Sequence, residues 1–386
     1  MAKAQGECHP CFDALRAELE KQIASGDELG ASIVLNVDGT NVVDIWAGYT
    51  DEARTKPWTK DTITNVWSCT KTVATLAALL QVSRGKLDLD APVAQYWPEF
   101  AQNGKEKVLV RHFLSHTAGL PGWTEPITVE ELCDLKVSTD RLEKQAPVWE
   151  PGRVSGYHAI SQGHLIGELI RRTSGKTMKQ FVADEIAGPL QADFQIGAVE
   201  EDWSRIAPII PAPTMPIDFA SLDPKSPTFM AFANPPLDAT WALRPKWRRA
   251  DLSGANGHAN ARSLVRILSS ITKGGTNDGV EILTPQIIEK IFEVQADGMD
   301  VVDQVPLRSG IGYGLTGGTT SQSIDWLPQG RVCFWGGWGG SLILMDLDRK
   351  VTFSYVMNKM GSGIFGSERT EAYTRIVYKA LGVEGF

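Results

Sequence analysis

The distribution of strand-like and helix-like segments along the chain constrains the fold more than any other sequence feature. Strand-like runs rich in β-branched and aromatic residues occupy residues 31–47 and 331–357, and the segments between them are mostly helical. Such runs bury their apolar faces when they join one sheet that helices cover. We therefore predict an α/β (α+β) protein, in which an antiparallel sheet built from N- and C-terminal segments is flanked by helices and carries an inserted, mostly helical domain.

The length of 386 residues suggests two domains or one large elaborated domain. We expect a discontinuous α/β sheet domain over residues 1–85 and 255–386 and a helical domain over residues 86–254. Asp38-Gly39 lies between two β-rich runs and predicts a tight hairpin turn. The expected strands span residues 31–37, 40–47, 62–67, 331–335, 341–347 and 351–357, and the expected helices span residues 11–24, 72–82, 128–145, 160–174, 176–187, 259–273, 284–296 and 368–381.

A proline-rich stretch over residues 208–245 interrupts the helical half of the chain. Nine of the 21 prolines fall here, together with Phe219, Met230, Phe232 and Trp241. The stretch is too apolar for a disordered linker and too rich in proline for regular secondary structure. We predict that it forms an ordered lid or one wall of a pocket.

Charge and composition narrow the class of partner. The net charge is -8, with 46 acidic and 38 basic residues and no cluster of Lys and Arg, so we expect no nucleic-acid partner and no membrane partner. The N-terminus lacks the apolar core of a signal peptide, and no apolar run reaches the ~20 residues that a membrane span needs. Five cysteines, an odd number in a long chain, fit a reducing compartment. We therefore predict a cytoplasmic location.

Two histidine or cysteine patterns have the spacing of metal ligands. Cys8-His9-Pro10-Cys11 has the spacing of a redox pair or of half a zinc site, but a second cysteine pair and a following βαβ pattern are missing. His112 and His116 are four apart, as in a helical metal pair, but the glutamate of H-E-x-x-H is missing. We expect neither pattern to bind a metal. We also expect no cofactor, because no nucleotide-binding glycine motif lies in a strand-turn-helix setting.

The spacing S-x-x-K occurs at Ser68/Lys71, Ser83/Lys86 and Ser270/Lys273. The two later pairs lie beside glycine, as is typical of the last turn of a helix, so we expect them to be caps at the surface. Ser68 instead follows a strand-like run and opens a helix, where its hydroxyl faces unpaired backbone N–H groups and the lysine returns one turn later. From these residues alone, Ser68 is either a nucleophile with a basic partner or an N-cap serine beside a partly buried lysine.

Four further motifs follow the first S-x-x-K pair. They are Leu114–Leu120 (LSHTAGL), Pro151-Gly152 followed by Tyr157, Gly312-Tyr313-Gly314, and Trp335–Ser341 (WGGWGGS). S-x-x-K is a motif of β-lactamases and penicillin-binding proteins. Together, and in this order, the five motifs resemble the class C β-lactamase-like serine hydrolase superfamily, and within it the family VIII carboxylesterases. The resemblance covers about residues 30–360, apart from the proline-rich stretch.

The resemblance implies roles for three side chains and two backbone groups. Ser68 matches the nucleophile that is acylated, Lys71 its activating partner, and Tyr157 the tyrosine of the Tyr-x-Asn element, and either Lys71 or Tyr157 could be the general base. The N–H groups of Ser68 and Trp338 match the oxyanion hole. Taken without the resemblance, Tyr157 could be a half-buried tyrosine bonded to backbone, and Trp335–Ser341 could be a glycine-rich β-bulge.

Two departures from the family pattern bear on the substrate. Trp335 stands where β-lactamases have the lysine of Lys-Thr-Gly, and Ala159 stands where they have the asparagine of Tyr-x-Asn. Both changes remove polar recognition, so the site should favour apolar, uncharged groups. The expected substrate contacts are Trp335, Gly336, Gly337, His158 and Trp241, with Trp123 as a further candidate.

These inferences favour a serine carboxylesterase that hydrolyses apolar, small-molecule carboxylic esters through an acyl-enzyme on Ser68. The enzymatic alternatives are an acyltransferase that uses the same acyl-enzyme and a β-lactamase or amidase. A catalytically silent binding protein on the same fold is the alternative from another class. An α/β-hydrolase has no support, because the motif G-x-S-x-G does not occur in the chain.

Overall fold

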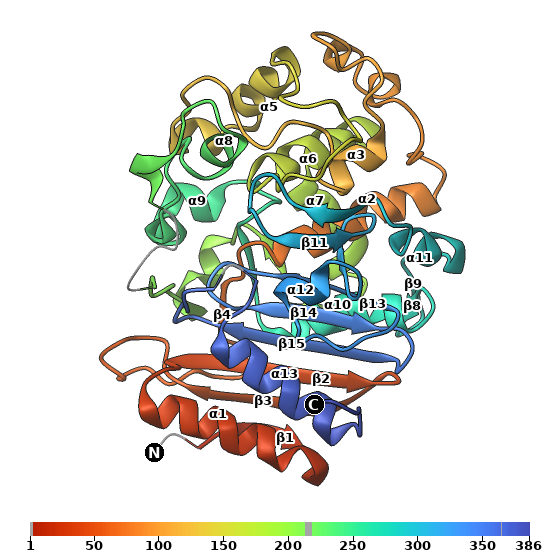
Figure 1. The fold of residues 1–386 in the computed structure, drawn as a ribbon. Coiled ribbons are helices and arrows are strands. Elements are labelled where there is room, and N and C mark those ends of the chain that lie inside the picture. Colours follow the sequence, from red (N-terminus) through yellow and green to blue (C-terminus); the bar gives the residue numbers. More distant parts are fainter. Residues whose placement is uncertain (1–2, 213–217, 364) are drawn as a thin grey trace.

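The computed structural model describes residues 3–212, 218–363 and 365–386. Across these residues, nine strands form one antiparallel sheet to which both ends of the chain contribute, as predicted (Figure 1). In sheet order the strands are β1 (Gln5–Cys8), β3 (Thr40–Gly48), β2 (Gly30–Val37), β15 (Val351–Met357), β14 (Leu342–Asp346), β13 (Val332–Gly336), β12 (Gly314–Leu315), β11 (Pro306–Ser309) and β10 (Ala296–Met299).

Helices cover both faces of this sheet. Along β15 the side chains alternate between the faces. Tyr355 packs on Tyr373 of α13 (Glu368–Ala380), with ring centroids 5.0 Å apart, whereas Thr352 hydrogen-bonds to Thr272, the last residue of α10 (Ala261–Thr272), at 2.9 Å. The helix α1 (Asp13–Ser25) packs beside α13. Because both faces are covered, β13, β14 and β15 are buried along their whole length.

The predicted Asp-Gly hairpin joins β2 to β3. Asp38 (φ 47°) and Gly39 (φ 89°) both adopt left-handed backbone conformations, and Val37 pairs with Thr40 across the turn. Two consecutive positive φ angles are the signature of the type I′ turn, whose twist matches that of the flanking strands. The turn therefore fixes the register of the two N-terminal strands.

The helix α2 (Thr70–Ser83) runs through the middle of the molecule. It contacts α6 (Ser161–Ser174) and α7 (Met178–Val182) on one side and α10 and α11 (Pro285–Ile291) on the other. Of its 14 residues, only two are not buried, which explains why its sequence is apolar nearly all round. The first turn of α2 is therefore presented between the sheet and the helical part of the chain.

The remaining helices of the described chain are short. Most of them lie together above the edge of the sheet in Figure 1. The division into two domains at residues 85/86 and 254/255 remains a prediction. These short helices are α3 (Val110–Leu114), α4 (Val129–Leu132), α5 (Leu135–Lys144), α8 (Pro227–Phe232), α9 (Pro245–Arg249) and α12 (Thr320–Ser323). A second sheet has the order β5 (Gln195–Ile196), β7 (Gly257–Ala259), β4 (Ile63–Asn65), β6 (Ile206–Ala207), and β8 (Thr276–Asn277) pairs with β9 (Val280–Glu281).

Some predicted element bounds are wrong. The helix expected over 128–145 is broken at Cys133, because the Asp134 side chain accepts from the N–H groups of Lys136 and Val137 and so begins a new helix, α5. The helix expected over 284–296 ends at Ile291, and the chain then enters β10. The strand expected over 62–67 is only three residues long.

The cysteine pattern with metal-ligand spacing lies at the N-terminal edge of the sheet. Cys8 ends the edge strand β1, and Cys8 and Cys11 are both free thiols. Within the described ranges, no three His, Cys, Asp or Glu side chains are grouped so that they could hold a metal ion.

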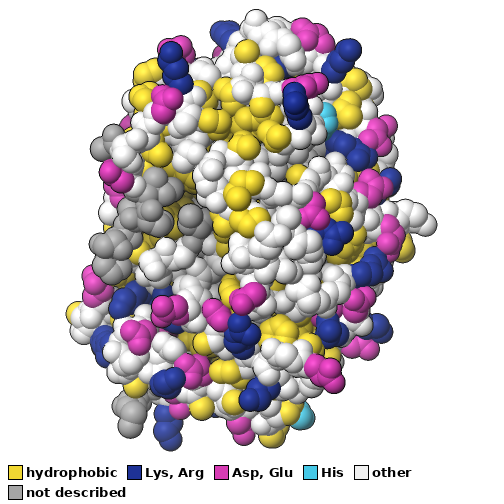
Figure 2. Space-filling view, viewed as in Figure 1, with side chains coloured by type: hydrophobic (Ala, Val, Ile, Leu, Met, Phe, Trp, Pro, Cys, Tyr) yellow, Lys and Arg dark blue, Asp and Glu magenta, His cyan; other side chains and the backbone are white. Residues whose placement is uncertain are grey.

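Figure 2 shows basic and acidic side chains intermixed on the face in view, without a basic cluster. In the described part of the chain, no helix combines the length and apolar character that crossing a membrane requires.

A buried ion pair ties the C-terminal helix to the N-terminal half of the sheet. Arg369 of α13 bonds to the Glu28 carboxylate at 2.8 Å and to the carbonyl oxygens of Asp27 and Lys359, each at 2.6 Å. Glu28 is completely buried. A buried pair can be close to neutral in its net effect on stability, but removal of one partner leaves an unpaired buried charge.

We expect Arg369→Ala to lower the free energy of unfolding by about 3 kcal/mol, because Glu28 would lose its counter-ion. The matched control is Arg375→Ala on the same helix, whose partly exposed pair with Glu371 (2.8 Å) should contribute less than about 1 kcal/mol. Urea unfolding followed by circular dichroism measures both. Equal losses in the two variants would contradict the argument.

Candidate active site

Ser68 lies in a tight turn between β4 and α2, and β7 holds both ends of that turn. The backbone N–H of Val66 donates to the carbonyl oxygen of Gly257 at 2.8 Å. The N–H of Gly257 in turn donates to Thr70 Oγ1, in the first turn of α2, at 2.8 Å. Ser68 is therefore fixed from both sides by a segment almost 190 residues further along the chain.

The turn requires a left-handed backbone at Trp67 (φ 47°), which is unusual for a bulky side chain. The Trp67 ring packs against Trp247 and Trp338, with centroid distances of 5.7 and 5.0 Å. This packing holds the strained residue in place, and the strain lies directly before Ser68.

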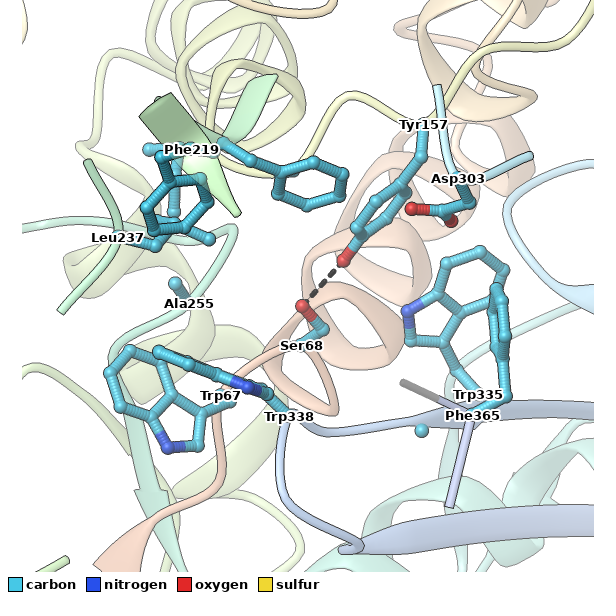
Figure 3. A pocket seen from close by; sticks show the side chains of 14 residues that line it. Trp67, Ser68, Tyr157, Phe219, Leu237, Ala255, Asp303, Trp335, Trp338 and Phe365 are labelled. Carbon is cyan, nitrogen blue, oxygen red and sulfur yellow. Dashed lines mark hydrogen bonds between the residues drawn. The ribbon is translucent and has the colours of Figure 1, made fainter. Parts of the chain in front are cut away.

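The three side chains matched by the S-x-x-K and tyrosine motifs meet in space. Ser68 Oγ lies 2.6 Å from the Tyr157 hydroxyl (Figure 3) and 3.0 Å from Lys71 Nζ. Ser68 does not cap α2, since the N-cap position is Cys69, and Tyr157 bonds to this serine rather than to backbone. The geometry therefore matches a serine with two proton-transfer partners.

Lys71 is almost completely buried, with 2% of its surface exposed. Its Nζ donates to the carbonyl oxygens of Ala159 (2.7 Å) and Gly254 (2.6 Å) as well as to Ser68. Burial disfavours the ammonium form and lowers the pKa of Lys71 to about 7, and the more distant Asp303 carboxylate opposes part of this effect. At neutral pH, a large share of Lys71 is therefore the free amine.

Tyr157 is held on both its backbone and its ring. Its N–H donates to Asp300 Oδ1 (3.0 Å), and its ring packs against His116 and Trp335, with centroid distances of 5.1 and 5.8 Å. Burial raises the pKa of the Tyr157 phenol, although the hydrogen bond with Ser68 acts in the opposite direction. Tyr157 is therefore a neutral phenol at physiological pH.

Asp300 is a residue that the sequence analysis missed. Besides Tyr157, its carboxylate accepts from Ser155 Oγ (2.9 Å) and from the N–H groups of Val302 (2.9 Å) and Asp303 (3.0 Å). These bonds join the loop before β11 to the tyrosine segment. An aspartate whose side chain accepts from the N–H groups two and three residues later is a common sign of a turn. The sequence could therefore have indicated the turn at Asp300, but not the bond from Asp300 to the distant Tyr157 N–H.

The end of β13 approaches the nucleophile segment through glycine. A Cβ atom at Gly337 would lie 2.4 Å from the carbonyl oxygen of Val66, so only glycine allows this approach. The described residues provide no hydrogen-bond partner for the N–H groups of Ser68 and Trp338. The Ser68 N–H is therefore unpaired at the N-terminal end of α2, where the helix dipole also favours negative charge, and the Trp338 N–H is unpaired in a residue that lines the same pocket.

An aromatic pocket that is partly open to solvent lies over Ser68 (Figure 3). Among the described residues that line it, Asp303 is the only acidic or basic side chain, and most of the others are apolar. The lining residues are Trp67, Ser68, Tyr157, Ala159, Ile160, Phe219, Phe232, Leu237, Ala255, Asp303, Trp335, Gly336, Trp338 and Phe365.

The predicted substrate contacts fall into two groups. Trp335 and Gly336 line the pocket, whereas Gly337 packs against Val66 behind it. His158 is buried beneath the pocket, where Nε2 accepts from the N–H of Leu120 (3.1 Å) and Nδ1 bonds to the carbonyl oxygen of Gly156 (2.6 Å). Both ring nitrogens of His158 are thus occupied by backbone, and the structure does not bring this residue to the pocket.

The predicted tryptophans Trp241 and Trp123 also lie outside the pocket lining. Trp241 is buried against Trp247, with ring centroids 5.6 Å apart, and so supports Trp67 from behind. Trp123 Nε1 donates to the carbonyl oxygen of Ser138 at 3.0 Å. Both residues therefore contribute to packing beneath the site.

The proline-rich stretch contributes one wall of the pocket. Phe219, Phe232 and Leu237 line it, in agreement with the predicted pocket wall, whereas Met230 is buried outside the lining. Residues 213–217 of this stretch lie outside the described residues. Three apolar side chains from this stretch thus face the nucleophile.

The other two S-x-x-K pairs lie at the C-terminal ends of helices, away from the pocket. Ser83 is the last residue of α2, and Lys86 beyond it is exposed. Ser270 lies in the last turn of α10, and Lys273 Nζ donates to Asn277 Oδ1 at 2.6 Å. The helix-end positions agree with the prediction, but Ser270 is completely buried rather than at the surface, because α10 packs on the sheet.

The fold and the site geometry define a class of enzyme, a serine hydrolase in which serine, lysine and tyrosine meet at the start of a buried helix beside an antiparallel sheet. The family model named Beta-lactamase matches residues 15–376. The chain belongs to this Beta-lactamase family.

Both esterases and a penicillin-binding protein homolog are among the proteins that resemble this chain. The esterase/beta-lactamase LipL of Mycobacterium tuberculosis is 32% identical over 346 residues, which cover 86% of this chain and 77% of LipL. The crystal structures of a family VIII carboxylesterase and of a novel penicillin-binding protein homolog from Caulobacter crescentus each have a TM-score of 0.90 and 33% identity, over 98% of this chain and 99% of the other. The resemblance, the fold class and the enzyme class predicted from sequence are confirmed.

We expect Gly337→Ala to reduce activity at least about 100-fold, because an added Cβ would lie 2.4 Å from the Val66 carbonyl oxygen, so the backbone beside Trp338 or the turn that carries Ser68 must shift. If the Trp338 N–H is an oxyanion donor, as proposed below, its displacement costs about 3 kcal/mol. The matched comparison is Gly336→Ala, where the nearest atoms to an added Cβ lie at an ordinary 3.7 Å. Steady-state kinetics and thermal unfolding of both variants measure the difference. A Gly337→Ala enzyme with wild-type kcat would contradict this account of the close approach.

Proposed function

We propose that the protein is a serine carboxylesterase that hydrolyses apolar carboxylic esters through an acyl-enzyme on Ser68. The observation that carries this proposal is the contact of Ser68 Oγ with both Lys71 and Tyr157 at the base of an aromatic pocket. The names of the relatives, an esterase/beta-lactamase and a family VIII carboxylesterase, support the same reaction.

Lys71 is the group we assign as general base for acylation. A neutral amine has two N–H groups and one lone pair. The ammonium form donates to Ala159, Gly254 and Ser68, whereas in the free amine the two carbonyl oxygens accept both N–H groups and the lone pair accepts from the Ser68 hydroxyl across the same 3.0 Å contact. Lys71 then takes the hydroxyl proton while Ser68 Oγ forms a bond to the carbonyl carbon of the ester.

Tyr157 completes the proton transfer to the leaving group. As a neutral phenol it donates its proton to the leaving alkoxide and recovers one from the Lys71 ammonium, so the alcohol departs and the acyl group stays on Ser68. In the second half, water gives its proton to Lys71 through Tyr157 and attacks the acyl carbon. Ser68 leaves with a proton returned by the same route, and the free acid is released.

The backbone N–H groups of Ser68 and Trp338 are assigned to the oxyanion hole. Neither N–H has a hydrogen-bond partner among the described residues, and Ser68 and Trp338 line the same pocket. Donors that are fixed before the reaction stabilise the tetrahedral oxyanion without any reorganisation. The positive end of the α2 dipole adds to this stabilisation.

The pocket lining supports an apolar ester over a β-lactam. No lysine, arginine or histidine is among the lining residues, so a substrate carboxylate would lose its hydration without gaining a cation. Trp335 occupies the position of the lysine that β-lactamases carry, and it extends the aromatic wall. Uncharged, hydrophobic acyl or alcohol groups gain the most from this surface.

We expect Ser68→Ala to lower the turnover of p-nitrophenyl butyrate by about 10³-fold or more. The matched control is Ser83→Ala, which removes the serine of another S-x-x-K pair at the far end of the same helix and should retain wild-type turnover. Wild-type turnover in the Ser68 variant would rule out the proposed nucleophile. If the wild type itself is inactive, labelling of Ser68 by a fluorophosphonate separates an acyltransferase from a silent binding protein.

The pH dependence follows from the neutral Lys71. Burial lowers its pKa from the usual 10.5 to about 7, so the basic form is lost as the pH falls below 7. We expect kcat/KM for p-nitrophenyl butyrate to rise with an apparent pKa near 7 and to level off above pH 8. Rates measured from pH 5.5 to 9, with hydroxide hydrolysis subtracted, test this, and constant activity down to pH 5.5 would contradict it.

A further inference from the structure

The Asp303 carboxylate lines the aromatic pocket without a partner. Its Oδ1 is buried and has no hydrogen bond, and neither of its oxygens forms an ion pair within the described residues. Figure 3 shows the carboxylate beside the Tyr157 ring and close to Trp335. Asp303 as a whole is partly exposed, but a buried carboxylate oxygen without a partner destabilises a protein, so its placement in a binding pocket points to a ligand group.

A hydrogen bond within its own loop fixes the backbone of Asp303. The Asp300 carboxylate accepts from the backbone N–H of Asp303 at 3.0 Å and from that of Tyr157 at 3.0 Å. The same aspartate therefore positions the tyrosine of the catalytic site and the unpartnered carboxylate.

The charge of the pocket determines what can pair with Asp303. Burial and the neighbouring Asp300 raise the pKa of the Asp303 carboxyl well above its usual range, whereas Lys71 opposes this effect. A second cation placed against Asp303 would favour the carboxylate form. The lining residues include no basic side chain, so this cation must come with the ligand.

The aromatic rings around Asp303 add to the attraction for a cation. The faces of Tyr157 and Trp335 carry negative electrostatic potential, and a desolvated cation–π contact contributes about as much as a hydrogen bond. Hydrophobic carbon groups on the same ligand fit the remaining apolar lining. An alkylammonium group satisfies both requirements, whereas an anion or an uncharged alkyl group leaves the carboxylate unpaired.

We propose that Asp303 selects esters that carry an ammonium group, which it holds between its carboxylate and the rings of Tyr157 and Trp335. This proposal rests on the proposed esterase function and names its substrate class. It refines the expectation of uncharged substrates, because the chain supplies one carboxyl group to an otherwise apolar pocket, and a bound cation favours the ionised form of that group.

The test compares esters that have the same shape but differ in charge. On the acyl side, the pair is p-nitrophenyl 4-(trimethylammonio)butanoate and p-nitrophenyl 5,5-dimethylhexanoate. On the alcohol side, the pair is choline butanoate and 3,3-dimethylbutyl butanoate. For each pair, the ratio of kcat/KM for the charged ester over the neutral ester is divided by the corresponding ratio for hydroxide hydrolysis, which removes the difference in intrinsic reactivity.

We expect this corrected ratio to fall about tenfold in Asp303→Asn for at least one pair. The matched control is Asp38→Asn, which removes the same charge from the β2–β3 turn, at the end of the sheet opposite Gly336, and keeps a residue that tolerates the left-handed backbone. The control should keep the wild-type ratio. An unchanged ratio in Asp303→Asn overturns the proposal, including the case in which both esters slow equally because Asp303 acts on Lys71.

A binding measurement separates this proposal from the esterase proposal. Benzyltrimethylammonium is titrated against Ser68→Ala and against Ser68→Ala/Asp303→Asn, with the fluorescence of the pocket tryptophans as the signal. We expect binding about tenfold weaker in the double variant, even if the wild type hydrolyses none of the esters. Equal binding by the two proteins overturns the ammonium site. If Asp303→Asn does not fold, a corrected wild-type ratio above about ten supports the site and a ratio near one overturns it.

Discussion

The desolvation of one lysine is the constraint on which the site depends. Lys71 lies inside the molecule without a carboxylate bonded to it, and two backbone carbonyls and Ser68 satisfy its hydrogen bonds. An ammonium in this position is unfavourable, whereas a neutral amine fits well. The carbonyl oxygens come from Ala159 and Gly254, which are far apart in sequence, so this environment of Lys71 forms only when the whole central region is folded around α2.

This dependence explains how the two parts of the chain cooperate. The sheet contributes the end of β13 and with it the Trp338 N–H, and the helical part contributes Tyr157 and the Ala159 carbonyl. The helix α2 lies between them and presents Ser68 at its first turn. Neither part alone contains a complete site, which fits the position of the pocket at their junction.

Sequence reasoning recovered the long elements and the motif residues. The strands of β2, β3, β13, β14 and β15 and the helices α2, α6, α10 and α13 have strong patterns or good caps, and the order of the motifs placed Ser68, Lys71 and Tyr157 together. Sequence could not reveal β11 and β12, because strands of two to four residues have no readable periodicity. The role of Asp300 and the exposure of Asp303 to the pocket depend on a loop packed against the tyrosine segment from about 145 residues away. His158 and Trp241 were natural candidates for the substrate, but only tertiary packing decides which side of a wall a residue occupies.

The close approach of Gly337 to the Val66 carbonyl also bears on how this enzyme can diversify. The segment at the end of β13 both packs on the turn that carries Ser68 and forms part of the pocket wall. A larger side chain at Gly337 would therefore disturb the proposed catalytic geometry and the substrate pocket together. Phe219, Phe232 and Leu237 line the pocket from the proline-rich stretch, so their side chains can be changed without altering the backbone at the end of β13. Directed evolution toward bulkier or more polar esters should therefore concentrate its libraries on the proline-rich stretch and leave the glycines at the end of β13 untouched.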